Sequence, residues 1–121
     1  MNINDYTGRR YDFRRYNCWG HVRAVRADVG IDTPAFDVAT PSGADAMFAE
    51  GFRDSRGLVR VGAPQDFDAV LMGERHGNRI VWHSGVYYSG YVSHCELAAR
   101  QVKLESLADI RARFQEIQFW R

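Results

Sequence analysis

Apolar residues recur at helical spacing near the start of the 121-residue chain, and again towards its middle and its end. In the first stretch, an apolar residue follows every three or four positions, at Cys18, Val22, Val25 and Val29. Asn17 can cap a helix that starts after it, and Gly30 can end that helix. We therefore predict a helix from 18 to about 29. Similar spacing predicts a second helix near 43–54. Its buried side is expected to hold Ala44, Met47, Phe48 and Phe52.

The stretch from 67 to 95 has the apolar pattern of strands, separated by turn residues. The predicted strands are "FDAVLMG" at 67–73, "RIVWHSGVYY" at 79–88 and "YVSHC" at 91–95. Gly77-Asn78 and Ser89-Gly90 are turn signals between them, so we expect an antiparallel meander. Residues 1–16 are polar and aromatic and are predicted to form an extended or irregular lead-in.

The tail of the chain returns to helical spacing after a candidate cap at Ser106. The apolar face of this predicted helix consists of Leu107, Ile110 and Phe114. Phe119 and Trp120 are unusually apolar for a chain end, so they either pack on the sheet or dock into a partner protein. Helices first and a meander afterwards predict an α+β fold class, with helices packed on one face of a small antiparallel sheet.

The turn at Ser89-Gly90 fixes which residues of the second hairpin lie opposite each other. With a two-residue loop, Gly85 lies opposite His94, and alternation places His83 on the same face. Diagonal neighbours on one face are roughly 7 to 8 Å apart, so the two imidazoles can meet. Gly85 is expected to leave open space over that face, for another element or a ligand. A three-residue loop would instead send His94 to the opposite face.

Composition narrows the classes of function. A chain of this length with 45% hydrophobic residues suffices for one core, so we expect a single domain over 1–121. Its 16 basic and 15 acidic residues nearly balance, which argues against nonspecific binding to nucleic acid or to an anionic membrane. No apolar run has the form of a signal peptide or a membrane span. Two cysteines are too few for a disulfide framework, which favours synthesis in a reducing compartment.

Cys18 becomes a candidate nucleophile when the predicted elements are combined. A thiol in the first helical turn faces free amide groups and the positive end of the helix dipole, and both favour the thiolate. If the start of this helix packs on the histidine face, His83 can act as general base or ion-pair partner of Cys18. His94 then holds the ring of His83 in the productive tautomer, which completes a Cys-His-His triad.

The same residues resemble the motifs of a known family. "NCWGHVR" at 17–23 is similar to the Asp-Cys-Trp-Gly-Leu-Val-Arg form that phage-tail members of the NlpC/P60 cysteine peptidases show at the start of a helix. "HSGVY" at 83–87 resembles the family's His-Val-Gly-Ile-Tyr strand, and "QDFDAVLM" at 65–72 resembles the strand before it. The family's third polar residue corresponds to His94. The resemblance extends from about Tyr6 to His94 and implies a circularly permuted papain-like core.

The resemblance also implies roles for residues around the nucleophile. Tyr11 is the best match to a family tyrosine that helps to bind the reacting carbonyl, with Arg10 in place of a proline. Asn17 stands where many members have Asp, but Asn still caps a helix. Ser84 replaces a Val, a change expected to affect packing alone. His21 is unusual for the family and is interpreted either as a substrate contact or, more simply, as a partly exposed helix residue.

In that family the reaction is hydrolysis of an amide bond in the peptide stem of bacterial peptidoglycan, and it needs no cofactor or metal. A short chain without a signal peptide or an appended wall-binding domain is most similar to the phage-tail members. We therefore expect a protein made in the cytoplasm of a bacterial host that acts in the virion tail at the cell wall. Phage tail-tip proteins are its candidate partners, and neither nucleic acid nor a membrane is expected among them.

Other interpretations of these residues remain open. Cys18 could be a small buried residue, while a disulfide with Cys95 is disfavoured because alternation points Cys95 away from the face of His94. Zinc held by Cys18, His83 and His94, with His21 as a fourth ligand, has acceptable ligand types but no recognisable paired spacing. The same fold could also serve a catalytically silent structural or assembly protein of the tail, or a papain-like acyltransferase.

Overall fold

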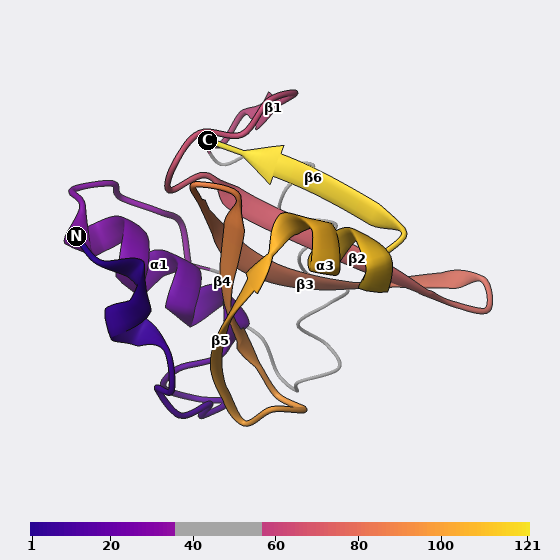
Figure 1. Ribbon diagram of the computed structural model, residues 1–121, viewed down its shortest axis with the longest axis horizontal. Helices are drawn as coiled ribbons and strands as arrows, with labels where there is room; N and C mark the ends of the chain where they lie inside the picture. Colours follow the sequence, from indigo (N-terminus) through magenta and orange to yellow (C-terminus); the bar gives the residue numbers. More distant parts are fainter. Residues whose placement is uncertain (36–56) are drawn as a thin grey trace.

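The computed structural model describes residues 1–35 and 57–121 and shows an α+β arrangement around an antiparallel sheet (Figure 1). In these residues the sheet has six strands in the order β1-β6-β2-β3-β4-β5. The strands are β1 (Arg60–Val61), β2 (Ala69–His76), β3 (Arg79–Tyr88), β4 (Tyr91–Glu96), β5 (Gln101–Ser106) and β6 (Glu116–Trp120). The helices are the 3-10 helix η1 (Ile3–Tyr6), α1 (Cys18–Asp28) and α3 (Leu107–Arg113). The helix predicted near 43–54 lies outside the described residues.

Helices α1 and α3 lie on opposite faces of the sheet. Ala69 and Leu71 of β2 pack in the buried cluster that contains α1, whereas Val70 and Met72 pack in the cluster that contains Ile110 of α3. Successive side chains of a strand point to opposite faces, so an unbroken apolar run in β2 serves both clusters. The prediction that the helices share one face is therefore wrong for these two. Within the described ranges, neither helix is long and apolar enough to cross a membrane.

The tail of the chain contains the predicted helix and also two strands that were not predicted. Ser106 caps α3, and its Oγ accepts a hydrogen bond from the amide of Asp109 at 3.1 Å. After α3 the chain enters β6, which pairs with both β2 and β1. Phe119 is buried in the cluster of α3, and Trp120 packs against the cluster of α1. Both residues therefore pack in the sheet, the first of the two predicted alternatives.

The hairpin of β3 and β4 has the predicted register in the three pairs nearest the turn, but the predicted pair of Gly85 and His94 is not part of the ladder. The strands pair over three positions, up to Val86 opposite Ser93, and their pairing ends there although both strands continue. The loop residues Ser89 and Gly90 both have positive φ, 46° and 88°, as a two-residue type I′ turn requires. The right-handed strand twist favours this turn, which is why a short loop fixes the register.

Gly85 does not leave open space over the sheet, contrary to the prediction. A Cβ atom at this position would lie 2.7 Å from Cγ1 of Val92, 2.9 Å from the carbonyl oxygen of Ser93 and 3.0 Å from Cβ of His94. The absence of a side chain is needed for the close approach of β4 to β3. This close approach brings His94 beside β3.

Residues 8–11 of the lead-in cover the outer side of β5, the last strand of the sheet. Three backbone hydrogen bonds join the two segments: Gly8 N to Val102 O (3.0 Å), Val102 N to Arg9 O (2.8 Å) and Tyr11 N to Arg100 O (2.9 Å). In Figure 1, the N-terminal segment and α1 lie together beside β4 and β5. The lead-in is therefore tied to the sheet a few residues before Cys18.

Candidate active site

A cavity of about 200 Å³ lies where the start of α1 meets β3 and the end of β4. Cys18 lines it from the helix on one face of the sheet. His83 lines it from the other face, because it pairs with Met72, whose side chain packs in the cluster of α3. The two faces meet here because the pairing of β3 with β4 has already ended. The wall is mainly apolar and includes Phe13, Val81, Leu97 and Phe114.

Cys18 is the first residue of α1 and is 8% exposed. Its helix starts there because the side chain of Asn17 accepts a hydrogen bond from the amide of Gly20 at 2.8 Å. The amide group of the Asn17 side chain donates to the carbonyl of Phe13 at 3.0 Å, which ties the lead-in to the cap. The thiol therefore lies at the positive end of the helix dipole, where a thiolate is favoured.

His83 and His94 meet, as the predicted register requires. Nε2 of His83 lies 2.9 Å from Nδ1 of His94, and the rings are nearly perpendicular, at 79°. The ring of His83 also stacks on Phe114, with the ring planes 20° apart. Burial lowers the pKa of His83 well below its ordinary value, and the neighbouring His94 lowers it further. Both effects favour a neutral imidazole, which can accept a proton.

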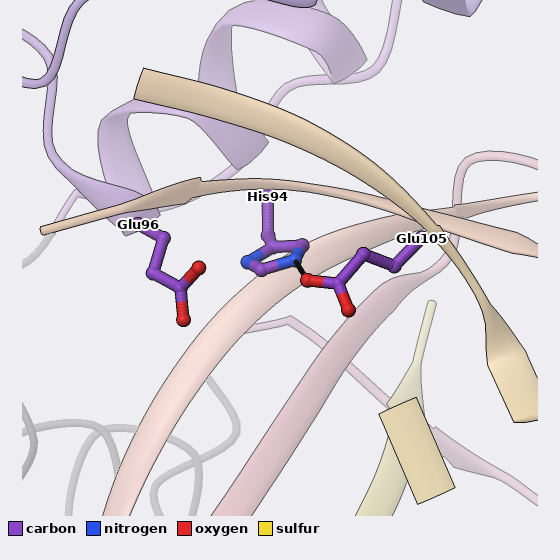
Figure 2. A group of neighbouring side chains, drawn as sticks. All are labelled: His94, Glu96 and Glu105. Atoms are coloured by element: carbon purple, nitrogen blue, oxygen red, sulfur yellow. Dashed lines mark hydrogen bonds and ion pairs between the residues drawn. The ribbon is translucent and has the colours of Figure 1, made fainter. Parts of the chain in front are cut away.

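The fully buried His94 has a second partner, which the sequence did not indicate. Its Nε2 lies 2.9 Å from Oε1 of Glu105 in β5, and Figure 2 shows His94 between Glu96 and Glu105 with this bond dashed. Arg113 of α3 donates hydrogen bonds to both carboxylates. Alternating apolar and polar residues in "QVKLES" at 101–106 could have revealed β5 and hence Glu105, whereas the cue of Ser106 favoured the helix after it.

The carboxylates beside His94 could in principle hold a metal ion. One ligand atom each of His94, Glu96 and Glu105 lies within 4.8 Å of the others. However, Arg113 already donates to both carboxylates, and Nζ of Lys103 lies 4.0 Å from Glu96 and 3.7 Å from Glu105. Two cationic side chains thus balance two anionic ones, and a metal ion would first have to displace the guanidinium group. The arrangement fits an ion-pair network better than a metal site.

His21 is fully buried, so the prediction of a partly exposed helix residue is wrong. Its Nδ1 lies 2.7 Å from the hydroxyl of Tyr16, and its Nε2 lies 2.9 Å from Oγ of Ser93. Both ring nitrogens are therefore engaged on the α1 side of the sheet, which does not fit the zinc set with Cys18. Burial, with smaller contributions from His94 and Arg9, lowers the pKa of His21 to about 3.

Cys95 is a buried free thiol that points away from the face of His94, as alternation predicted. Cys18 lies in the same buried cluster, however, so alternation does not separate the two cysteines as expected. Neither thiol is part of a disulfide bond in the described residues. The thiol of Cys95 donates to the carbonyl of Tyr16 at 3.4 Å, and burial, followed by the effect of Cys18, raises its pKa to about 12. Cys95 therefore has the properties of a structural residue.

Tyr11 also lines the cavity, at the end of the lead-in segment that covers β5. Its backbone amide donates a hydrogen bond to the carbonyl of Arg100, which fixes the segment on the sheet. The sequence-predicted site residues Cys18, Tyr11 and His83 thus share one cavity, and His94 is joined to it through His83. A comparison with protein-family models finds no match for the chain, and a comparison with curated proteins also finds none.

Proposed function

We propose that the protein is a cysteine peptidase or amidase that cleaves the peptide stem of bacterial peptidoglycan, on a circularly permuted papain-like core. The observation that carries the proposal is the cavity that Cys18 and His83 share, with His94 hydrogen-bonded to His83. A thiol at a helix start, an imidazole and a group that orients this imidazole are the parts that thiol hydrolysis requires. The resemblance of the motifs to NlpC/P60 peptidases supplies the substrate class.

The reaction would proceed in two halves. Nδ1 of His83 takes the proton of the Cys18 thiol, because Nε2 is engaged with His94. The thiolate attacks the carbonyl carbon, the C–N bond breaks, and the protonated His83 gives its proton to the leaving amine. A water molecule then attacks the thioester, and His83 takes its proton. The acid is released and the thiolate is restored.

The oxyanion would be stabilised at the start of α1. The backbone amides of the first turn and the positive end of the dipole favour negative charge there. Tyr11 lines the same cavity and is the candidate side-chain donor to the oxyanion. We further propose that the enzyme acts in a phage tail and opens the cell wall locally, with tail-tip proteins as its partners.

The decisive experiment is mass spectrometry of purified peptidoglycan fragments incubated with the protein. Intact protein should release fragments cut at one stem-peptide bond, and the Cys18→Ala variant should release none. A Cys95→Ala variant is the matched control, since it removes a thiol with a raised pKa and should retain cleavage.

Two other outcomes would overturn the proposal. Absence of cleavage from every stem type, with folded protein and an unreactive Cys18, would indicate a structural or assembly protein of the tail. An acyl group that forms on Cys18 and passes to an amine or a lipid in place of water would indicate an acyltransferase.

A further inference from the structure

A chain of hydrogen bonds runs from Glu105 through both histidines towards the cavity. Oε1 of Glu105 lies 2.9 Å from Nε2 of His94, and Nδ1 of His94 lies 2.9 Å from Nε2 of His83. We propose that Glu105 is a positioning residue, which fixes the tautomers of both rings and leaves Nδ1 of His83 unprotonated. The proposal rests on the proposed function, because it assigns Glu105 to the same reaction.

The direction of the chain follows from the chemistry of its first member. An ionised carboxylate has no proton to donate, so Nε2 of His94 must carry the hydrogen of the first bond. A neutral His94 then has a lone pair on Nδ1, which accepts from the Nε2 hydrogen of His83. A neutral His83 in turn has its lone pair on Nδ1. Each ring can therefore adopt only one tautomer if both hydrogen bonds are to be kept.

The surroundings keep Glu105 in its acceptor form. Burial raises the pKa of its carboxyl group, but hydrogen bonds from Arg113 and His94 outweigh this and hold the pKa below its ordinary value. Nζ of Lys103 adds a positive charge 3.7 Å from Oε1 of Glu105. Arg113 is itself held in place by Glu96, so its guanidinium group joins β4, β5 and α3.

The tautomer matters because the other form of His83 cannot take a proton from the thiol. With hydrogen on Nδ1, His83 would have its lone pair on Nε2 and would accept a hydrogen bond from Nδ1 of His94. Nε2 of His94 would then carry a lone pair, so it would accept a hydrogen bond from residue 105 in place of donating one. A glutamine at position 105 can provide this reversal, since its amide group can donate where the carboxylate accepts. Glu105→Gln is thus a nearly isosteric test of direction.

The experiment measures the ¹⁵N chemical shifts of the histidine side chains together with steady-state kinetics on peptidoglycan fragments. In intact protein, His83 and His94 should both show hydrogen on Nε2 and a free Nδ1. In Glu105→Gln, at least one ring should change tautomer, and kcat should fall roughly 10- to 100-fold with little change in KM. Glu74→Gln is the matched control, because Glu74 is exposed and contacts a different histidine, His76.

The spectra test the proposal without any substrate, so its failure is separable from failure of the proposed function. If the protein is inactive but shows the expected tautomers, the positioning role of Glu105 stands and the proposed hydrolase function is rejected. A protein whose cleavage depends on Cys18, but whose tautomers and kcat are unchanged by Glu105→Gln, overturns the role of Glu105 alone. If Glu105→Gln does not fold, hydrogen on Nδ1 of His83 in the intact protein is sufficient to overturn it.

Discussion

Ser84 has a fully buried hydroxyl that finds no hydrogen-bond partner among the described residues. A buried hydroxyl without a partner costs about 1 to 3 kcal/mol. We predict that Ser84→Ala increases the free energy of unfolding by about 1 kcal/mol, measured by urea denaturation. Ser93→Ala is the contrasting variant: it removes the partner of Nε2 of His21 and should lower stability. A loss of stability in Ser84→Ala would mean that its hydroxyl has a partner after all.

The two cysteines should differ sharply in reactivity. Both thiols line the cavity, but at neutral pH we expect iodoacetamide to alkylate Cys18 first, since it is partly accessible and lies at the start of α1. Cys95 should remain unmodified in the folded protein, because its thiol is fully buried and has a pKa of about 12. Peptide mapping of the alkylated protein gives the order. Faster modification of Cys95 would contradict the assignment of Cys18 as the nucleophile.

At the scale of elements, the start of α1 determines the position of the thiol. We predict that Asn17→Ala lowers the free energy of unfolding by about 1 kcal/mol, because it removes the helix cap, in which the side chain of Asn17 accepts a hydrogen bond from the amide of Gly20. It should also slow alkylation of Cys18, since the first turn is no longer fixed. Ser106→Ala removes the equivalent cap of α3, so it should cost a similar amount without affecting the thiol. Equal alkylation rates in both variants would argue against the role of the cap.

The close approach of β3 and β4 depends on Gly85. Gly85→Ala should destabilise the protein by about 1 to 3 kcal/mol, because its Cβ would lie 2.7 Å from Val92 and 2.9 Å from the carbonyl of Ser93. The free energy of unfolding in urea measures the effect. Gly62→Ala is the control, as a Cβ there would meet nothing within 4 Å. An equal effect of the two substitutions would show that the strands adjust without cost.

The elements that local patterns specify were predictable, while those that depend on distant pairing were not. The hairpin at Ser89-Gly90 and the helix after Asn17 each have a strong local signal, a turn or a cap. Strand β6 has five residues, and its place between β1 and β2 is fixed by tertiary pairing. Because β5 and β6 flank α3, a prediction without these strands could not place α3 on the face of the sheet opposite α1. Glu105 was missed for a different reason: β5 has a local alternating pattern, but the cap signal at Ser106 drew attention to the helix after it.

At the scale of the whole molecule, three histidines link stability to pH: His21 and His94 are fully buried and His83 is half-buried. Burial lowers the pKa values of His21, His83 and His94, that of His21 from 6.5 to about 3. Below pH 6.5 the unfolded chain binds protons at these residues while the folded chain does not. The free energy of unfolding should therefore be highest above pH 6.5 and fall below it, by up to about 1.4 kcal/mol per pH unit for each histidine that stays neutral in the folded chain. For His21 this loss continues towards pH 3.

Urea denaturation at pH 7, 6, 5 and 4 measures this dependence. An exposed histidine provides the control, so His76→Gln should leave the slope against pH unchanged. A stability that is constant from pH 7 to pH 5 would show that these rings are protonated in the folded protein or accessible to water.

The lead-in segment over β5 has a consequence for self-association. An exposed strand edge offers unpaired amides and carbonyls to any other chain, and sheets with such edges are prone to add strands from neighbouring molecules. Residues 8–11 occupy that position along Arg100–Val102, so the segment that helps to shape the cavity also shields the sheet. Deleting the lead-in would remove Tyr11 from the site and at the same time create a template for fibril growth.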